Sequence, residues 1–327
     1  MDWQGAPVLV TGAGGFIGST LCERLVAGGA RVRALVHYNA LGSWGWLDRS
    51  EVKDRIEVVA GDLADRDMMV EAARGVDTIF HLGALIAIPY SYSAPESYVR
   101  TNVIGTLNVL QAARQAGVRR MIQTSTSEVY GTARVVPIPE THPLQGQSPY
   151  SASKIGADKM AESFFLSFGV PVVTVRPFNT FGPRQSARAV IPTIITQALA
   201  GEEVKLGNLR PTRDLNYVSD TVEGFLKAAE AEGVEGEVIN LGSGREISVG
   251  DLAQLIVGRI GGKARIVTDA QRLRPDASEV ERLLADASKA EKLIGWRSQV
   301  TLEEGLDRTI AFIRENLHLY RPDRYNV

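Results

Sequence analysis

The stretch that decides the fold is PVLVTGAGGFIGSTLCERLVAGGARVRALVHYN, residues 7–39. It contains an apolar run, a glycine cluster, a helix-like segment and a second apolar run. Gly12, Gly15 and Gly18 have the spacing GxxGxxG, directly after the predicted strand and at the start of the predicted helix. Such glycines allow a tight turn and a close approach of the backbone to a diphosphate, and the helix N-terminus supplies unpaired N–H groups. The stretch therefore predicts a dinucleotide-binding site.

The alternation of apolar runs and amphipathic segments continues along the chain. Six further runs follow the first: RVRALV, IEVVAGD, DTIFHLGA, RRMIQTSTS, PVVTVRPFN and EVINLG. Strands that alternate with helices need crossover connections and predict a parallel sheet. We therefore expect an α/β fold with a doubly wound parallel sheet of the Rossmann type, formed by residues 1–178 and a returning segment, 214–243. Residues 179–213 and 244–327 are expected to form a smaller C-terminal lobe.

The composition disfavours several classes of function. The chain has 327 residues, 44% of them hydrophobic and 23% charged, with a formal net charge of -2. It lacks the excess of basic residues that nucleic-acid binding usually needs, so no nucleic-acid partner is expected. The single cysteine, Cys22, excludes an intramolecular disulfide and a Cys-rich metal site, and no metal is expected. Because neither a signal peptide nor a membrane-spanning run is recognised, we expect a cytoplasmic protein without membrane contact.

The end of the second apolar run departs from the usual pattern of a dinucleotide site. A carboxylate that binds the NAD ribose is expected about 20 residues after the glycines, yet residues 36–39 read VHYN. Without a carboxylate to repel a 2′-phosphate, and with Arg33 and His37 nearby, NADP stays open. NAD also stays open, because Asn39 and the backbone could hold the ribose hydroxyls. Asp62, after the third run, is a candidate partner for the adenine, although a strand-end turn or a helix cap is an equally good interpretation.

A tyrosine and a lysine supply candidate acid–base chemistry. Tyr150 and Lys154 are four residues apart, so on a helix they lie on one face. A lysine cation and a cationic nicotinamide ring favour the phenolate of a neighbouring tyrosine, which could take a proton from a sugar hydroxyl while hydride leaves the same carbon. The run MIQTSTSEVYG ends at the carboxyl edge of the sheet, where open α/β folds bind ligands. There Thr126 is positioned to bond the same hydroxyl, and Glu128 adds a carboxylate.

Several motifs occur in one order along the chain: VTGAGGFIGS, GDL, HLGA, TNVIGTLNVLQAA, TSTSEVYG, PYSASK, RPFNTFGPRQ and RDLNYVSDTVEGF. On these motifs the chain resembles, over nearly its full length, the extended short-chain dehydrogenase/reductase family of nucleotide-sugar enzymes. The resemblance implies a tightly bound NAD or NADP that is regenerated in each turnover, and a UDP- or GDP-linked sugar as substrate. It also implies a homodimer formed through the segments 96–115 and 148–168.

The resemblance assigns roles to individual residues. Thr126, Tyr150 and Lys154 correspond to the catalytic set of the family. The expected cofactor contacts are Gly12, Gly15, Phe16, Ile17, Gly18, His37, Asn39, Asp62, Leu63, Leu82, Tyr150 and Lys154. The expected substrate contacts in the smaller lobe and around the site are Tyr90, Asn179, Arg184, Arg213 and Arg274. Among these, Arg213 and Arg274 correspond to the diphosphate clamp of family members, a role that suits bidentate guanidinium groups.

Within the family, Glu128 helps to separate the activities. Simple 4-epimerases usually carry a small or neutral residue there, whereas in 4,6-dehydratases this place holds the base that removes the proton on carbon 5. In glucose-type dehydratases an aspartate precedes it as an acid. Here that residue is Ser127, a form that mannose-type dehydratases share, so the identity of the acid stays open. UDP-glucuronate decarboxylases also share TSEVYG.

Three longer stretches refine the expectation: VHYNALGSWGWLD, LIAIPYSYSAPESYV and PFNTFGPRQSARAVIPTIITQALAG. They resemble the 4,6-dehydratases that act on nucleotide-linked N-acetylglucosamine in legionaminic acid and related amino-sugar pathways. We therefore expect a dehydratase that forms the 4-keto-6-deoxy sugar. A 4-epimerase or a UDP-glucuronate decarboxylase is the alternative. A non-catalytic cofactor-sensing protein is less favoured, because such proteins usually lose the tyrosine or the lysine. The nucleobase and the sugar configuration stay open.

Overall fold

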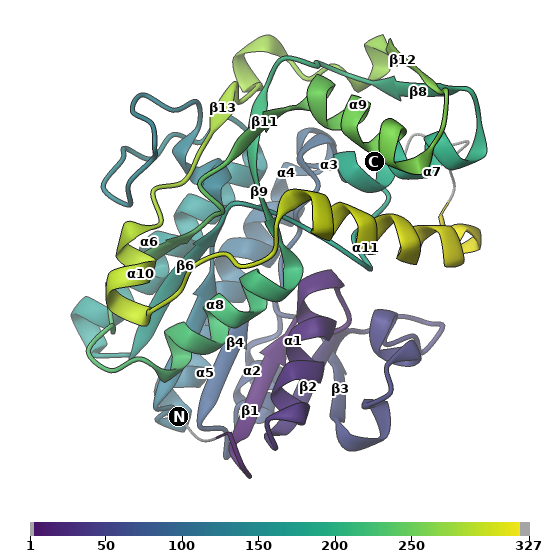
Figure 1. The fold of residues 1–327 in the computed structure, drawn as a ribbon. Helices are drawn as coiled ribbons and strands as arrows, with labels where there is room; N and C mark the ends of the chain where they lie inside the picture. The colour runs from purple at the N-terminus through teal and green to yellow at the C-terminus, as the bar shows by residue number, and fades with distance from the viewer. Residues whose placement is uncertain (1–2, 321–327) are drawn as a thin grey trace.

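A seven-stranded parallel sheet forms the larger part of the molecule (Figure 1). The computed structural model describes residues 3–320. The strand order is β10-β6-β5-β4-β1-β2-β3, so the chain runs outward from β1 first to one edge and then to the other. The strands are β1 (Pro7–Thr11), β2 (Arg31–His37), β3 (Glu57–Gly61), β4 (Thr78–His81), β5 (Arg120–Thr124), β6 (Val172–Pro177) and β10 (Val238–Leu241). The expected doubly wound parallel sheet is confirmed.

Helices cover both faces of this sheet (Figure 1). One face carries α1 (Phe16–Ala27) and α8 (Val218–Glu230), with α10 (Ser288–Ile294) against α8. The other face carries α2 (Arg66–Ala72), α5 (Gly105–Ala116) and α6 (Pro149–Phe168). The chain enters α5 through α3 (Ile88–Ser93), α4 (Pro95–Tyr98) and a π-helical segment, Val99–Ile104. The remaining short helices are 3-10 turns at Gly45–Arg49, Lys53–Arg55, Ser127–Tyr130, Ala270–Arg272, Asp276–Ser278 and Leu317–Leu319.

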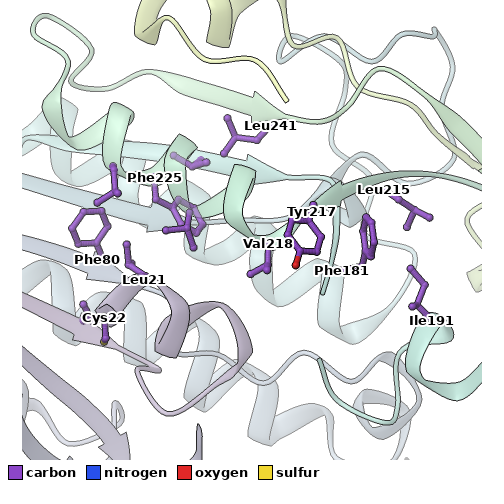
Figure 2. Close-up of a cluster of buried hydrophobic side chains, with 14 of the residues drawn as sticks. Leu21, Cys22, Phe80, Phe181, Ile191, Leu215, Tyr217, Val218, Phe225 and Leu241 are labelled. Atoms are coloured by element: carbon purple, nitrogen blue, oxygen red, sulfur yellow. The ribbon is translucent and has the colours of Figure 1, made fainter. Parts of the chain in front are cut away.

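Side-chain alternation along β1 supplies both layers of the core. Val8 and Val10 point toward α1 and α8, whereas Leu9 packs on the opposite face with residues of α2 and α5. The first cluster continues without a break into the smaller lobe, where Phe181 and Tyr217 stack edge to face with ring centroids 5.6 Å apart (Figure 2). One hydrophobic core therefore holds the sheet and the smaller lobe together.

The smaller lobe is built from short strands and three helices. In its four-stranded sheet, β9 (Thr212–Tyr217) pairs with β7 (Asn179–Phe181), β11 (Glu246–Ser248) and β13 (Arg282–Leu283). The other elements are β8 (Glu203–Leu206), β12 (Arg265–Thr268), α7 (Val190–Ala200), α9 (Val249–Ile260) and α11 (Leu302–Glu315). After β9 the chain returns to the large sheet through α8 and β10. The expected boundaries of the two lobes stay a proposal. No helix within residues 3–320 combines the length and apolarity needed to cross a membrane.

His81 joins three elements at the centre of the molecule. Its Nδ1 lies 2.7 Å from Thr11 Oγ1 at the end of β1, and its Nε2 lies 3.0 Å from Thr106 Oγ1 on α5. Thr106 donates its hydroxyl to the carbonyl of Asn102, so it accepts from Nε2–H, and Nδ1 accepts from Thr11. Burial lowers the pKa of His81 to about 3, with the Lys154 charge as a smaller cause. The folded protein therefore keeps this ring neutral.

His81→Gln is expected to remove part of the acid sensitivity of folding. The unfolded chain binds a proton at this histidine near pH 6.5, whereas the folded protein binds it only near pH 3. The unfolded state thus holds more protons in this window, and the free energy of unfolding falls by about 1.4 kcal/mol per pH unit as the pH drops below 6.5. Urea unfolding between about pH 5 and 8 measures this slope. Equal slopes for the variant and the unsubstituted protein would contradict the assignment.

Candidate active site

A cavity of about 1620 Å³ lies between the carboxyl edge of the large sheet and the smaller lobe. It is lined by residues that follow β1, β2, β4, β5 and β6, and by residues of the smaller lobe such as Arg213 and Arg274. This volume exceeds the roughly 300–1,000 Å³ typical of a site for one small ligand. The cavity therefore has room for a dinucleotide and a second ligand.

The glycine loop forms one wall of the cavity. Gly12 has a φ of 68°, and a Cβ there would lie 2.8 Å from the backbone of Gly83. A Cβ on Gly18 would lie 2.2 Å from the carbonyl oxygen of Gly12, so neither position accepts a side chain. Helix α1 begins at Phe16, after Gly15, with no side-chain cap and no acidic residue in its first turn. Its N-terminal N–H groups are thus available to an anion, and the loop fits a diphosphate.

The loop after β5 and the first turns of α6 bring all five predicted catalytic residues to this cavity. Thr126 caps the turn Ser127–Tyr130, and its Oγ1 accepts from the N–H of Glu128 at 3.3 Å. The Tyr150 hydroxyl is hydrogen-bonded to Thr126. Proline at the first position of α6 and the Ser148–Ser151 capping box fix where this helix begins. Lys154, one turn later, donates from Nζ to the carbonyl of Thr124 at 2.7 Å.

Burial controls the charges of Tyr150 and Lys154. It raises the pKa of the Tyr150 phenol, which the hydrogen bond from Thr126 partly offsets. It lowers the pKa of Lys154 to about 8, although Asp158 acts in the opposite direction. The ammonium form of Lys154 therefore still predominates at neutral pH. A cation near the phenol, such as an oxidised nicotinamide ring, would favour the phenolate.

A buried ion pair supports the catalytic loop from behind. Arg176 on β6 and Asp158 on α6 meet at 3.0 Å, with side chains only 5% and 4% exposed. Asp158 Oδ2 also accepts from Ser125 Oγ at 2.7 Å, and Arg176 Nη1 donates to the Tyr130 hydroxyl at 3.0 Å. Ser125 and Tyr130 flank the segment that carries Thr126 and Glu128. The pair thus holds both ends of that segment.

Asp158→Asn is expected to lower the free energy of unfolding by about 3–5 kcal/mol, because it leaves the buried Arg176 cation without a countercharge. The matched control is Glu304→Gln, which removes the exposed partner of Arg308 on α11. That change should cost about 0.5 kcal/mol or less. Urea unfolding at neutral pH compares the two variants. A loss below about 1 kcal/mol for Asp158→Asn would mean that the ion pair does not stabilise the fold as described.

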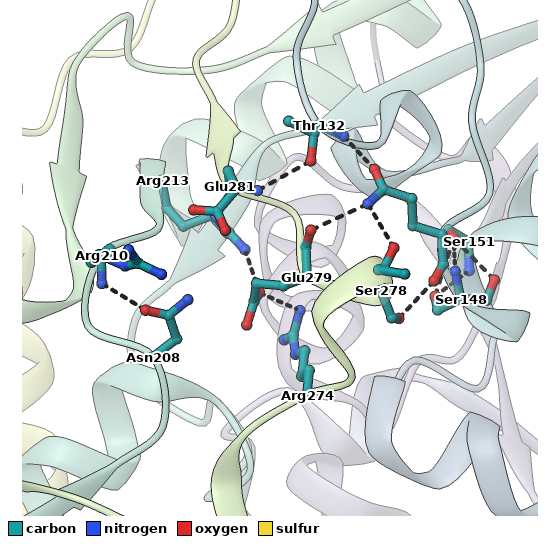
Figure 3. A network of polar contacts seen from close by, with 12 residues as sticks. Thr132, Ser148, Ser151, Asn208, Arg210, Arg213, Arg274, Ser278, Glu279 and Glu281 are labelled. Atoms are coloured by element: carbon teal, nitrogen blue, oxygen red, sulfur yellow. Dashed lines mark hydrogen bonds and ion pairs between the residues drawn. The ribbon is translucent and has the colours of Figure 1, made fainter.

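Two arginines of the smaller lobe share one carboxylate at the cavity (Figure 3). Glu279 Oε1 lies 3.6 Å from Arg213 Nη2 and 3.4 Å from Arg274 Nη1. Burial lowers the pKa of Arg213, while Glu128 is the largest opposing charge, which places the predicted base close to this arginine. Glu279 forms the ion pairs with both guanidinium groups, while Glu128 and Glu281 act on Arg213 at longer range. Both guanidinium groups line the cavity, where they can bind a diphosphate. The buried Oδ1 of Asn179 and Oγ1 of Thr124 also line the cavity, and neither has a hydrogen-bond partner within residues 3–320.

Three predicted contacts lie outside the cavity lining: Asp62, Leu63 and Tyr90. The Asp62 carboxylate accepts a hydrogen bond from the N–H of Ala64 at 2.9 Å. This contact is the one expected of an aspartate in a strand-end turn. Tyr90 packs its ring near Tyr98, with centroids 6.2 Å apart, while Tyr92 of the same helix lines the cavity. The roles of these three residues in binding stay predictions.

Two further predicted contacts line the cavity with their polar groups already engaged. Arg184 donates to Glu23 Oε1 at 2.8 Å and to Ser19 Oγ at 3.1 Å, so it ties the smaller lobe to α1. The amide of Asn39 bonds to the backbone of its own loop. The other predicted lining residues, all of which the structure places in the cavity, are Gly12, Gly15, Phe16, Ile17, Gly18, His37, Leu82, Asn179, Arg213 and Arg274. Four of the residues that line the cavity were not predicted from the sequence: Trp44, Arg49, Tyr92 and Glu279.

A family model described as GDP-mannose 4,6 dehydratase matches residues 9–309 of the chain. The chain belongs to this family. The expected place among the extended short-chain dehydrogenase/reductase enzymes of nucleotide sugars is therefore confirmed. Within residues 3–320, no group of three or more His, Cys, Asp or Glu side chains could hold a metal ion.

Relatives of this family catalyse different reactions. The chain is 35% identical to the UDP-glucose 4-epimerase of Mycolicibacterium smegmatis, over 94% of this chain and 98% of that protein. It is 32% identical to UDP-glucuronic acid decarboxylase 1 of Xenopus tropicalis, over 97% and 74%. Its structure matches the dTDP-glucose 4,6-dehydratase DesIV of Streptomyces venezuelae, solved with NAD bound, with a TM-score of 0.88, 31% identity and coverage of 97% and 100%. Family membership therefore supports a nucleotide-sugar enzyme and leaves three activities to separate.

Proposed function

We propose that the enzyme removes water from a nucleotide-diphospho-N-acetylglucosamine and forms the 4-keto-6-deoxy sugar. The observation that carries this proposal is the carboxylate of Glu128, which is only 9% exposed and lines the same cavity as the Thr126–Tyr150 pair. An oxidation and reduction at carbon 4 needs no such base. A dehydration needs one, because the proton on carbon 5 must be removed before the 6-hydroxyl can leave.

The residues of the cavity divide the reaction between them. The bound cofactor, NAD or NADP, supplies reversible hydride transfer. Tyr150, hydrogen-bonded to Thr126 and one turn before Lys154 on α6, takes the proton of the 4-hydroxyl. The resulting ketone acidifies carbon 5, and Glu128 removes that proton. The 6-hydroxyl then leaves as water with a proton from Ser127, a bound water or Glu128 itself. The hydride taken from carbon 4 would return to carbon 6, and a proton to carbon 5, which gives the 4-keto-6-deoxy sugar and leaves the cofactor unchanged. Arg213 and Arg274 hold the diphosphate of a UDP- or GDP-linked substrate.

Incubation of the purified enzyme with UDP-N-acetylglucosamine and, separately, GDP-N-acetylglucosamine tests this function. Mass spectrometry should show a product lighter by one water from one of the two. A product of unchanged mass but altered configuration would favour a 4-epimerase instead. Release of carbon dioxide from UDP-glucuronate would favour a decarboxylase. No turnover of any of these sugars would favour a non-catalytic protein. That alternative is the least favoured of the three, because Tyr150 and Lys154 are both present in the cavity.

We also propose a homodimer and a cytoplasmic location. The π-helical segment before α5 exposes Val99 and Ile104, and α6 exposes Leu166. These apolar side chains lie on segments 96–115 and 148–168, through which the family resemblance implies that two copies form a dimer. Burial of such side chains against a second copy would be favourable.

A further inference from the structure

The part of the cavity at the end of β2 is formed by a loop that packs on the glycine cluster. The N–H of Trp46 donates to the carbonyl of Gly14 at 2.9 Å, and a Cβ on Gly45 would lie 2.4 Å from the same oxygen. This contact places the turn that ends at Arg49 beside the glycine loop. His37, the last residue of β2, and Arg49 both line the cavity here. In this fold the adenosine ribose lies between the glycine loop and the end of the second strand.

No carboxylate lines this part of the cavity. Among the lining residues that the structure describes, the only acids are Glu128 in the catalytic loop and Glu279 in the smaller lobe. Asp48, the acid closest to Arg49 in the sequence, does not line the cavity. Its carboxylate accepts from Ser43 Oγ at 2.8 Å and from the N–H of Trp44 at 3.1 Å. Among the lining residues that the structure describes, no carboxylate belongs to the end of β2 or the loop after it.

The side chain of Asn39 is not available to hold ribose hydroxyls. Its Nδ2 donates to the carbonyls of His37 at 3.2 Å and Ser43 at 2.8 Å. Its Oδ1 accepts from the N–H groups of Leu41 at 3.2 Å and Ser43 at 3.1 Å. An amide side chain has two donor hydrogens and two acceptor lone pairs, so all four are used. The side chain that could have replaced the NAD carboxylate instead closes its own loop.

The two arginines near this strand differ in availability. Arg33 is bound by the Glu57 carboxylate at 2.9 Å and by the carbonyl of Ala72 at 2.8 Å, so its guanidinium is engaged. Arg49 is exposed, and its side chain makes no hydrogen bond or ion pair with any residue from 3 to 320. An exposed guanidinium that lines the cavity and has its N–H groups available supplies the charge and the donors that phosphate recognition needs.

We propose that Arg49 and His37 bind the 2′-phosphate of NADP and that the enzyme selects NADP over NAD. The guanidinium of Arg49 supplies paired N–H donors, and the His37 ring supplies a further N–H donor. This proposal rests on the nicotinamide cofactor of the proposed function and not on its sugar substrate. It holds whichever of the three family reactions the enzyme catalyses.

Calorimetric titration of the purified full chain, after removal of retained cofactor, with NADP and with NAD tests the proposal. The unsubstituted enzyme should bind NADP at least about tenfold more tightly than NAD, and Arg49→Ala should weaken NADP about ten- to a hundredfold while NAD affinity stays unchanged. His37→Asp should strengthen NAD binding and weaken NADP binding, because a carboxylate there accepts from the ribose 2′-hydroxyl and repels a 2′-phosphate. The control is Arg31→Ala at the opposite end of β2, which should change neither affinity.

Two results would overturn the proposal. One is an unsubstituted enzyme that binds NAD as tightly as NADP. The other is an Arg49→Ala variant that loses equal affinity for both dinucleotides, since that loss would not depend on the 2′-phosphate. The titration contains no sugar, so its result can be interpreted even if the dehydration assay fails. Mass spectrometry of the cofactor released from the freshly purified enzyme gives an independent readout, in which NADP is expected.

Discussion

Tyr150→Phe is expected to lower kcat for turnover of the nucleotide sugar by about a hundred- to ten-thousandfold, the usual contribution of a general acid–base group. The substitution removes only the hydroxyl that is hydrogen-bonded to Thr126. It leaves the ring, which packs against Tyr98 with centroids 6.2 Å apart. Cofactor affinity and the unfolding temperature should therefore change little. Steady-state kinetics with the sugar that proves to be the substrate measures the effect.

The matched control is Tyr38→Phe, which removes the same atom from a tyrosine that is 69% exposed and lies outside the cavity lining. Its kcat should equal that of the unsubstituted enzyme. A loss of less than about tenfold for Tyr150→Phe would show that another group takes the proton from the 4-hydroxyl.

Glu128→Gln should reduce the dehydration rate by a comparable factor, about a hundred- to ten-thousandfold, while the oxidation at carbon 4 persists. The two steps use different residues, because Tyr150 acts on the 4-hydroxyl and Glu128 on carbon 5. Glutamine keeps the size of the side chain but cannot accept a proton at neutral pH. The expected signature is absorbance of reduced nicotinamide after sugar is added, without a product lighter by one water. Tyr150→Phe should show neither signal.

Glu304→Gln supplies the control for this substitution, since Glu304 is an exposed acid on α11 outside the cavity lining. It should dehydrate at the normal rate. If Glu128→Gln also dehydrated at the normal rate, the base would lie elsewhere and the observation that carries the proposed function would fail.

The large sheet could be predicted because its signals are local. Each of the seven apolar runs became a strand. Helix α1 begins at Phe16, so the glycine cluster extends into its first turn, in line with its predicted place at the start of the helix.

The smaller lobe and the support of the site could not be predicted in the same way. Strands β11 and β13 have three and two residues, and both pair with β9 from distant parts of the sequence, so no local periodicity marks them. The Asp158–Arg176 pair joins a helix to a strand inside the protein. In the sequence these are two ordinary charged residues, because burial arises only when the chain has folded. Likewise, nothing in VHYN shows that Asn39 closes its own loop.

The ion pair behind the catalytic loop has a consequence for how this family changes its chemistry. Asp158 and Arg176 hold Ser125 and Tyr130, while Thr126, Ser127 and Glu128 stand between these two anchors. The ion pair is therefore separate from the reactive groups, and we expect substitutions at these three adjacent positions to change the reaction while the fold stays stable. This division makes the segment a natural target for engineering a different reaction on the same backbone.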